Sequence, residues 1–120
     1  DASVMFHQED DDELYDESGT TEFTFTKGPA VRTLQLSLVS HRQRFAARLW
    51  PAAMLLARHL HDNPVTVQGK CVLELGAGAA LPSLCACLEG ARAVLATDYP
   101  DERMLANIEA NLDSNLTERQ

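Results

Sequence analysis

The sequence predicts an α/β fold in which a parallel β-sheet follows an antiparallel β-hairpin. Two short apolar segments, residues 71–75 and 93–97, are each followed by a helix-like segment, and this strand–helix–strand–helix order is typical of a parallel sheet. A glycine-rich loop at residues 76–78 joins the first strand to its helix. Before them, residues 23–38 alternate between apolar and polar side chains about a Gly-Pro turn, which indicates the hairpin.

Charge is distributed unevenly along the 120 residues. The formal net charge is −8, but residues 1–26 contain nine acidic side chains and no Lys or Arg, whereas residues 27–120 contain nine acids and ten bases. The like charges from Glu9 to Glu13 repel one another and favour disorder. We therefore expect residues 1–21 to form an acidic, disordered leader, either a solubilising tail or bait for a basic partner. Residues 22–120 are expected to form one domain.

Composition disfavours several classes of protein. No apolar run approaches the roughly 18 residues that span a bilayer, and the first residues lack the basic and apolar regions of a signal peptide. The chain has no basic stripe and its leader would repel phosphates, so we expect neither membrane binding nor direct nucleic-acid binding. Three cysteines, an odd number, favour a reducing compartment, which we take to be the cytoplasm.

The hairpin is the first expected element. Phe23 and Phe25 alternate with threonines, and three leucines alternate with polar residues between positions 34 and 38. Because side chains of a strand point to opposite faces in turn, this pattern predicts two strands that are each buried on one face. Lys27-Gly28-Pro29 supplies the turn between them.

A helix is expected to begin at Pro51, because a proline in the first turn lacks only an N–H that a helix start leaves unpaired. An apolar stripe at helical spacing continues this helix, and Asp62-Asn63-Pro64 ends it. His59 and His61 lie near its end, where they suit the helix dipole. Their i, i+2 spacing puts them on different faces, so we expect no metal site there.

The second half of the sequence has the more regular order. We expect, in turn, a strand at residues 71–75, a glycine-rich loop at 76–78, a helix at 82–89 that stops at Gly90, a buried strand at 93–97 and a helix opened by Pro100. Asp101 and Glu102 fall in the first turn of the last helix, where acidic groups suit the dipole.

The last predicted helix carries two stripes of different polarity. The apolar stripe, expected to face the core, consists of Met104, Leu105, Ile108 and Leu112. The polar stripe repeats every four residues and consists of Asn107, Asn111 and Asn115. We interpret the asparagines as a solvated face, since a polar stripe on a helix usually lies opposite the core.

The glycine-rich loop and a later acid predict a binding site for a nucleoside. Backbone in Gly76-x-Gly78 can approach a polar ligand that a side chain would block, and the helix after the loop directs unpaired N–H groups toward the same place. Asp98, twenty residues past Gly78, ends the neighbouring strand, where its carboxylate can accept hydrogen bonds from both hydroxyls of a ribose. The plainer alternatives are a structural turn for the glycines and a helix cap for Asp98.

The third position of the glycine pattern helps to distinguish between two kinds of nucleoside cofactor. A dinucleotide fingerprint requires Gly or Ala at a third position, which here is Leu81, so a nicotinamide nucleotide is the weaker alternative. An adenosine linked to an amino acid, as in S-adenosylmethionine, does not need that close approach. The helix start could face its carboxylate, and Glu74 could help to hold its ammonium group; an acidic pocket tolerates its sulfonium charge. Glu74 should in any case have a polar partner, because a buried acid without one is costly.

These residues resemble a known family. Residues 72–83, Val-Leu-Glu-Leu-Gly-Ala-Gly-Ala-Ala-Leu-Pro-Ser, are similar to motif I of the class I, seven-β-strand, S-adenosylmethionine-dependent methyltransferases, and the Leu-Pro-Ser is similar to their protein lysine methyltransferases. The segments 97–101, 107–111 and 49–53 narrow the likeness to the nicotinamide N-methyltransferase-like fungal enzymes that methylate the N-terminus and an adjacent lysine of translation elongation factor one-alpha. The resemblance covers about residues 23–116.

The resemblance implies a Rossmann-like parallel sheet and S-adenosyl-L-methionine as the cofactor. By this likeness, Gly76, Ala77 and Gly78 border the methionine part of the cofactor, and Asp98 binds the ribose hydroxyls. Tyr99 then lies close to the adenine, and Trp50 lies beside the cofactor pocket. A plain core anchor is the alternative for Trp50.

The family sheet has seven strands, of which this chain supplies the first two of the core, so we expect it to be the N-terminal, cofactor-binding half of a methyltransferase domain. No segment matches the acidic-aromatic motif that faces the acceptor amine in the family, and the catalytic residues stay unassigned. The resemblance implies a protein amine as acceptor, a lysine or an N-terminal amino group, with elongation factor one-alpha as the candidate partner. The alternative from another class is a non-catalytic interaction module or truncated isoform with a vestigial cofactor loop.

Overall fold

The computed structural model describes residues 19–39 and 48–116, so the predicted acidic leader lies outside the described residues up to position 18. The elements follow in the order β1 (Thr20–Lys27), β2 (Ala30–Ser37), α1 (Pro51–Asp62), a 3-10 turn η3 (Pro64–Thr66), β3 (Cys71–Glu74), α2 (Leu81–Leu88), β4 (Ala93–Ala96) and α3 (Glu102–Asn115). This order confirms the predicted hairpin, the helix after it and the strand–helix–strand–helix unit.

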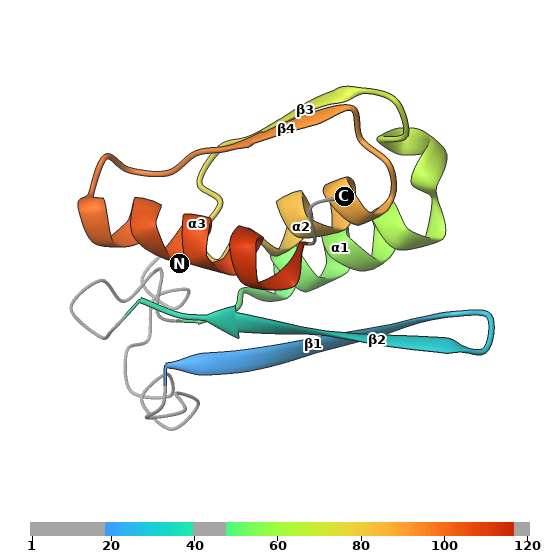
Figure 1. Ribbon diagram of the computed structural model, residues 1–120, viewed down its shortest axis with the longest axis horizontal. Helices are drawn as coiled ribbons and strands as arrows, with labels where there is room; N and C mark the ends of the chain where they lie inside the picture. Colours follow the sequence, from blue (N-terminus) through green and yellow to red (C-terminus); the bar gives the residue numbers. More distant parts are fainter. Residues whose placement is uncertain (1–18, 40–47, 117–120) are drawn as a thin grey trace, which may run out of the picture.

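The elements are arranged in three layers (Figure 1). The helices lie between two sheets of two strands each, with β1–β2 on one side and β3–β4 on the other. α3 packs on β2, α2 packs on both β3 and β4, and α1 runs against α2. The apolar core therefore lies in the helical layer, where buried side chains of the hairpin pack together with those of α2.

β1 and β2 pair antiparallel along their whole length. Their inner face is buried and consists of Phe23, Phe25, Leu34 and Leu36. The opposite face is largely polar, and the hydroxyls of Thr24 and Thr33 lie 2.9 Å apart on it. The alternation in the sequence thus predicts the hairpin correctly. β1 begins at Thr20, two residues before the residue at which we expect the domain to start.

The helix ends follow from local chemistry. α1 begins at Pro51 and ends at Asp62 as predicted, and Gly90, with φ +92°, follows the end of α2. α3 differs slightly, because the Asp101 carboxylate accepts hydrogen bonds from the N–H groups of Arg103 (2.9 Å) and Met104 (3.2 Å). Asp101 is therefore the N-cap and not a first-turn residue. Among the described residues, no helix has the length and apolar composition that a bilayer crossing requires.

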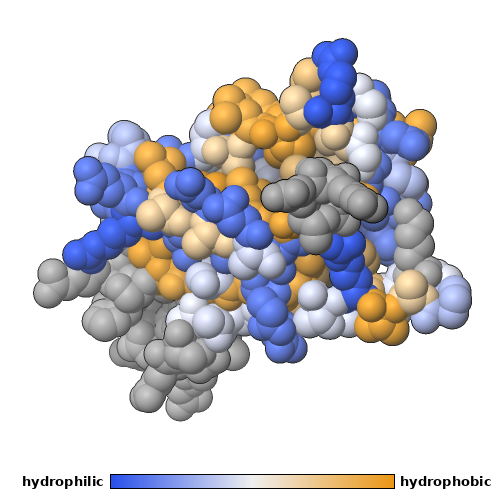
Figure 2. All heavy atoms as spheres, viewed as in Figure 1, coloured by the Kyte–Doolittle hydropathy of each residue, from blue (hydrophilic) through white to orange (hydrophobic). Residues whose placement is uncertain are grey.

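β3 and β4 pair in parallel, in register from Cys71 opposite Ala93 to Glu74 opposite Ala96. Only the face toward α2 is covered in the described residues. On the other face Leu73 is 60% exposed and Leu95 is 62% exposed. Figure 2 shows apolar side chains gathered at the top of the view, where Figure 1 places these strands. The expectation of a buried strand at residues 93–97 therefore holds for the face toward α2 and is wrong for the other face.

The polar stripe of α3 is the clearest departure from the sequence-based expectation. Asn111 is only 1% exposed, and its amide hydrogen-bonds to the backbone of Ser37 in β2. Asn107 also donates to the Ser37 carbonyl (2.9 Å), and Asn115 pairs with the backbone of Gln35. The prediction of a solvated face is wrong. These amides form hydrogen bonds with backbone N–H and C=O groups along the edge of β2 that does not pair with β1.

Candidate functional site

The candidate site lies where β3 and β4 end. The glycine-rich loop follows β3 and Asp98 follows β4, so the parallel pairing brings them to the same edge of the sheet. They border an open cavity of about 440 Å³. Its lining consists of Arg48, Leu49, Trp50, Ala52, Ala53, Leu56, Glu74, Gly76, Ala77, Gly78, Ala79, Pro82, Asp98 and Met104. Six of the seven site residues predicted from the sequence are thus brought together.

Gly76 and Gly78 both require glycine for conformational reasons. Their φ angles are +67° and +55°, in the left-handed region that side chains disfavour. A Cβ added to either residue would meet no other atom within 4 Å, so it would enter open space beside the cavity. The loop is therefore a tight turn and also leaves its backbone accessible from the cavity. This is the geometry in which a ligand can approach the main chain.

The loop is tied to the end of β4. The Gly78 N–H donates to Oδ2 of Asp98 (2.7 Å), and the Ala77 N–H donates to the Thr97 carbonyl (2.8 Å). The Tyr99 N–H donates to the other oxygen of Asp98 (2.6 Å). Each carboxylate oxygen thus accepts one backbone hydrogen bond, and a carboxylate can accept about four in all. Asp98 keeps acceptor capacity for two hydroxyls, and because Asp101 caps α3, the alternative of a helix cap is excluded.

Glu74 has the polar partner that its position in a strand requires. Its Oε2 accepts hydrogen bonds from the N–H of Ser83 (3.0 Å) and from the Ser83 hydroxyl. Burial raises the pKa of the Glu74 carboxyl above its ordinary value, while the two bonds from Ser83 oppose that rise. The sequence predicts that the N–H groups at the start of α2 point toward a ligand. Two residues there do not offer one, because the Ser83 N–H bonds to Glu74 and Pro82 has no N–H.

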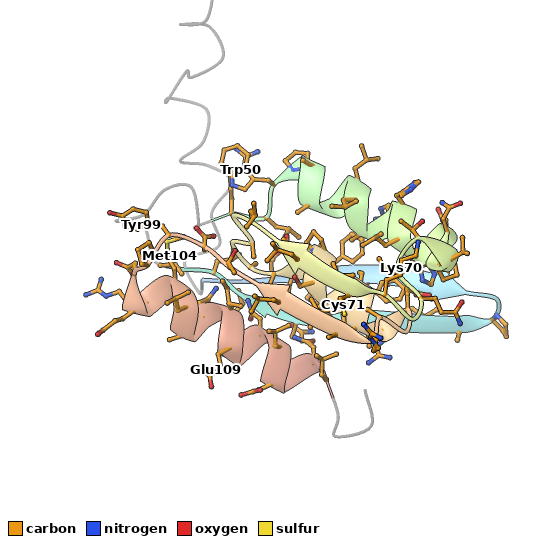
Figure 3. The ribbon with its side chains drawn as sticks, turned by 90° about the horizontal axis from the view of Figure 1, so that it is seen from above. Trp50, Lys70, Cys71, Tyr99, Met104 and Glu109 are labelled. Carbon is orange, nitrogen blue, oxygen red and sulfur yellow. The ribbon has the colours of Figure 1, made fainter. Side chains whose placement is uncertain are left out.

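Trp50 precedes α1 and forms part of the opposite wall. Its side chain is 40% exposed, so the alternative of a buried core anchor is wrong. The Arg48 guanidinium lies 4.4 Å from the centre of its ring, and Arg48 also lines the cavity, so the lining includes a cation. Tyr99 does not line the cavity and is 73% exposed. Figure 3 shows Trp50, Tyr99 and Met104 at one end of the β3–β4 sheet and Lys70 and Cys71 at the other.

Several cavity residues have no signal of function in the sequence. Leu56 and Met104 belong to apolar helix stripes, which predict core positions, yet both line the cavity. Ala53 and Pro82 complete this apolar wall. A hydrophobic side chain on a helix looks the same in sequence whether it faces the core or a ligand. Its role becomes visible only when the helices are packed.

His61 is a further residue whose surroundings the sequence does not indicate. Nδ1 lies 2.7 Å from Oε1 of Glu89, and Nε2 lies 2.6 Å from the Thr26 carbonyl oxygen. The imidazole therefore joins α1, the end of α2 and β1, a larger role than the predicted interaction with the helix dipole. In the described part of the chain, no group of three or more His, Cys, Asp or Glu side chains could hold a metal ion.

Comparisons with known proteins identify the family. A family model for lysine methyltransferases matches residues 32–120. The protein belongs to the lysine methyltransferase family. Its relatives include the protein N-terminal and lysine N-methyltransferase EFM7 of Eremothecium gossypii, 50% identical over 80 residues, a match that covers 67% of this chain and 30% of the relative. The enzyme of the same name from Schizosaccharomyces pombe is 44% identical over 79 residues, covering 66% of this chain and 31% of the relative.

A solved structure supports the fold as well. A 16S rRNA methyltransferase of T. thermophilus, in complex with AdoMet and guanosine, superimposes with a TM-score of 0.54 and 26% identity, over 80% of this chain and 25% of that one. The fold is therefore Rossmann-like and of the class I methyltransferase type. The chain spans just under a third of the length of the curated relatives that we name above.

Proposed function

We propose that the protein is an S-adenosylmethionine-dependent methyltransferase whose described residues form the cofactor-binding half of the site. The observation that carries this proposal is the convergence of the positive-φ glycines, Asp98 and Trp50 on one cavity at the carboxyl ends of two parallel strands. Ligands of open α/β sheets bind at such an edge. Membership of the lysine methyltransferase family supports the same conclusion.

The cavity residues fit this cofactor in kind. Asp98 has acceptor capacity left for the two ribose hydroxyls, and the open space beside Gly76 and Gly78 suits the methionine part. Trp50 would contact the cofactor from the other wall. We assign Tyr99 to the adenine and Glu74 to the ammonium group on the family resemblance. When bound, S-adenosylmethionine supplies an activated methyl group on a sulfonium, so the protein needs chiefly to hold an unprotonated amine in line with it.

The acceptor that we propose is a protein amine, a lysine side chain or an N-terminal amino group. The relatives are named as N-terminal and lysine methyltransferases, which supports this chemical class. The family resemblance singles out translation elongation factor one-alpha as the candidate substrate. Such a substrate and three free cysteines fit a cytoplasmic location. No residue among those described is assigned to catalysis at the acceptor.

Calorimetric titration with S-adenosylhomocysteine tests the cofactor site. We expect the chain to bind this product and Asp98→Ala to weaken binding at least tenfold, because charged hydrogen bonds to the ribose are lost; tenfold corresponds to about 1.4 kcal/mol. Asp101→Ala is the matched control, since it removes a nearby acid that caps α3 and lies outside the cavity lining. Its affinity should stay within about twofold of wild type.

The result that would overturn the proposal is a folded chain with no affinity for S-adenosylhomocysteine, or equal affinities for wild type and Asp98→Ala. Circular dichroism of each variant establishes that it is folded. In either case an interaction module with a vestigial cofactor loop becomes the better account of the chain.

A further inference from the structure

The amide of Asn111 lies between two segments that are far apart in sequence. Its Nδ2 donates to the carbonyl oxygens of Ser37 (2.9 Å) and Ala79 (3.0 Å), and its Oδ1 accepts from the Ser37 N–H (2.7 Å). A primary amide offers two donors and two acceptor sites. Three of these four are therefore used, all on backbone atoms, by a side chain that is almost completely buried.

Ala79 is the residue through which Asn111 reaches the cavity. It follows Gly78, lines the cavity itself and is buried. The next residue, Ala80, has φ +64°, so the chain turns sharply here before α2 begins. A buried carbonyl without a donor is costly, and the Ser83 N–H that could serve a helical carbonyl at this point is bonded to Glu74 instead. Asn111 meets this need from another helix.

Asn115, one turn later, provides an internal comparison. Its amide pairs with the backbone of Gln35, at 3.0 Å from the Gln35 N–H and 2.7 Å to the Gln35 carbonyl, as Asn111 pairs with Ser37. The match is geometric: four residues of helix rise about 6 Å and two residues of strand about 6.7 Å, so the two amides meet alternate residues of β2. Pairing with β2 is common to both asparagines. Contact with the loop belongs to Asn111.

We propose that Asn111 is a positioning residue of the cofactor site, which holds the loop after Gly78 in its binding conformation by donating to the Ala79 carbonyl. This inference rests on the proposed function. Asp98 and Thr97 hold the loop from the β4 side through Gly78 and Ala77, and Asn111 holds it from α3. A loop ordered before binding loses less conformational entropy when the ligand arrives, so its affinity is higher.

Hydrogen exchange and titration of three proteins test this: wild type, Asn111→Ala and, as the matched control, Asn115→Ala. In Asn111→Ala we expect the amides of Ala77, Gly78 and Ala80 to exchange at least tenfold faster and affinity for S-adenosylhomocysteine to fall about tenfold. Asn115→Ala should leave the exchange rates of these amides and the affinity within about twofold of wild type. Both variants should have a lower melting temperature, because each loses hydrogen bonds to β2. If Asn111 had a purely structural role, the two alanine variants would lose stability alike and the loop amides would exchange at the wild-type rate. That result would overturn the inference.

The outcomes separate this inference from the proposed function. If wild type binds and Asn111→Ala binds equally well, the positioning role is wrong and the cofactor site stands. If wild type does not bind, the proposed function fails, and loop exchange in Asn111→Ala still decides whether Asn111 orders the loop. Should the alanine variant be unfolded, wild type provides the test: the Asn111 side-chain protons should exchange at least tenfold more slowly than those of Asn115, and equal rates overturn the role.

Discussion

The antiparallel β1–β2 sheet and the parallel β3–β4 sheet differ in how they use their two faces. In β1–β2 the buried face is apolar and the exposed face is largely polar, so the pair can stand at the surface of a protein. In β3–β4 the face on α2 is apolar except for Glu74, which bonds to Ser83. The exposed face is apolar too, because it carries Leu73 and Leu95, with Leu75 just after β3. Parallel sheets are normally covered on both faces, and their strands are composed accordingly.

The two sheets are also attached to the helices by different interactions. The hairpin is held by apolar packing together with specific polar contacts, from His61 to the Thr26 carbonyl and from Asn111 and Asn115 to β2. The parallel pair packs on α2 through Val72 and Val94, and its backbone bonds continue into the loop that borders the cavity. Stability should therefore depend on buried leucines and titratable groups at the hairpin, and little on the outer leucines of β3–β4.

The largest effect that we predict compares equivalent substitutions in the two sheets. Leu34→Ala in β2 truncates a side chain that is 1% exposed and should lower the free energy of unfolding by about 2–5 kcal/mol. Leu95→Ala in β4 truncates one that is 62% exposed and should change it by no more than about 0.5 kcal/mol. Urea denaturation followed by circular dichroism measures both. Equal losses would mean that the outer face of β3–β4 is covered in solution.

The next effect depends on pH and is confined to the attachment of the hairpin. Burial by itself lowers the pKa of the His61 imidazole, but the hydrogen bond to Thr26 and the bond and charge of Glu89 outweigh it, so its pKa lies above the ordinary value of about 6.5. Both ring nitrogens face acceptors, which favours the doubly protonated form. Phe25 packs on the ring, and Asp62 is the other charge that raises its pKa.

Because the folded-state pKa is raised, the stabilisation is complete below about pH 6.5 and is lost as the pH rises through the higher folded-state value. His61→Ala should lower the free energy of unfolding by about 2 kcal/mol at pH 6. The part of the pH dependence of this free energy that comes from His61 should then be absent. His59→Ala, an exposed histidine of the same helix, is the control and should retain it. A pH profile that His61→Ala leaves unchanged would contradict this account.

The smallest effect concerns the outer face of the parallel pair. Leu73→Thr replaces an exposed leucine with a residue that suits a strand, so the melting temperature should shift by less than about 2 °C, or a few tenths of a kcal/mol. Its effect should instead be on association, because the exposed apolar patch becomes smaller. Sedimentation velocity at several concentrations measures this. A clear loss of stability in the monomer would show that the two sheets are more alike than their exposure indicates.

The elements could be predicted from the sequence because their signals are local. Alternating apolar residues predict β1–β2, Pro51 begins α1, Gly90 follows α2, and the glycines at 76 and 78 have the positive φ angles that their type favours. The candidate site follows from the same local order, since parallel strands bring Gly78 and Asp98 to one edge. The polar stripe of α3 could not be predicted correctly, because a helix period tells which residues share a face and not what that face meets.

By itself, therefore, the sequence determined the hairpin, the order of strands and helices, and the glycine–aspartate edge that predicts a nucleoside site. Only the tertiary structure decided that Asn111 binds Ser37, 74 residues away, and Ala79, and that His61 meets Glu89, 28 residues away. It also decided which face of β3–β4 is covered. The physical reason is that backbone propensities act within a few residues, whereas a buried polar group takes whatever partner the packing of distant elements brings within hydrogen-bond distance.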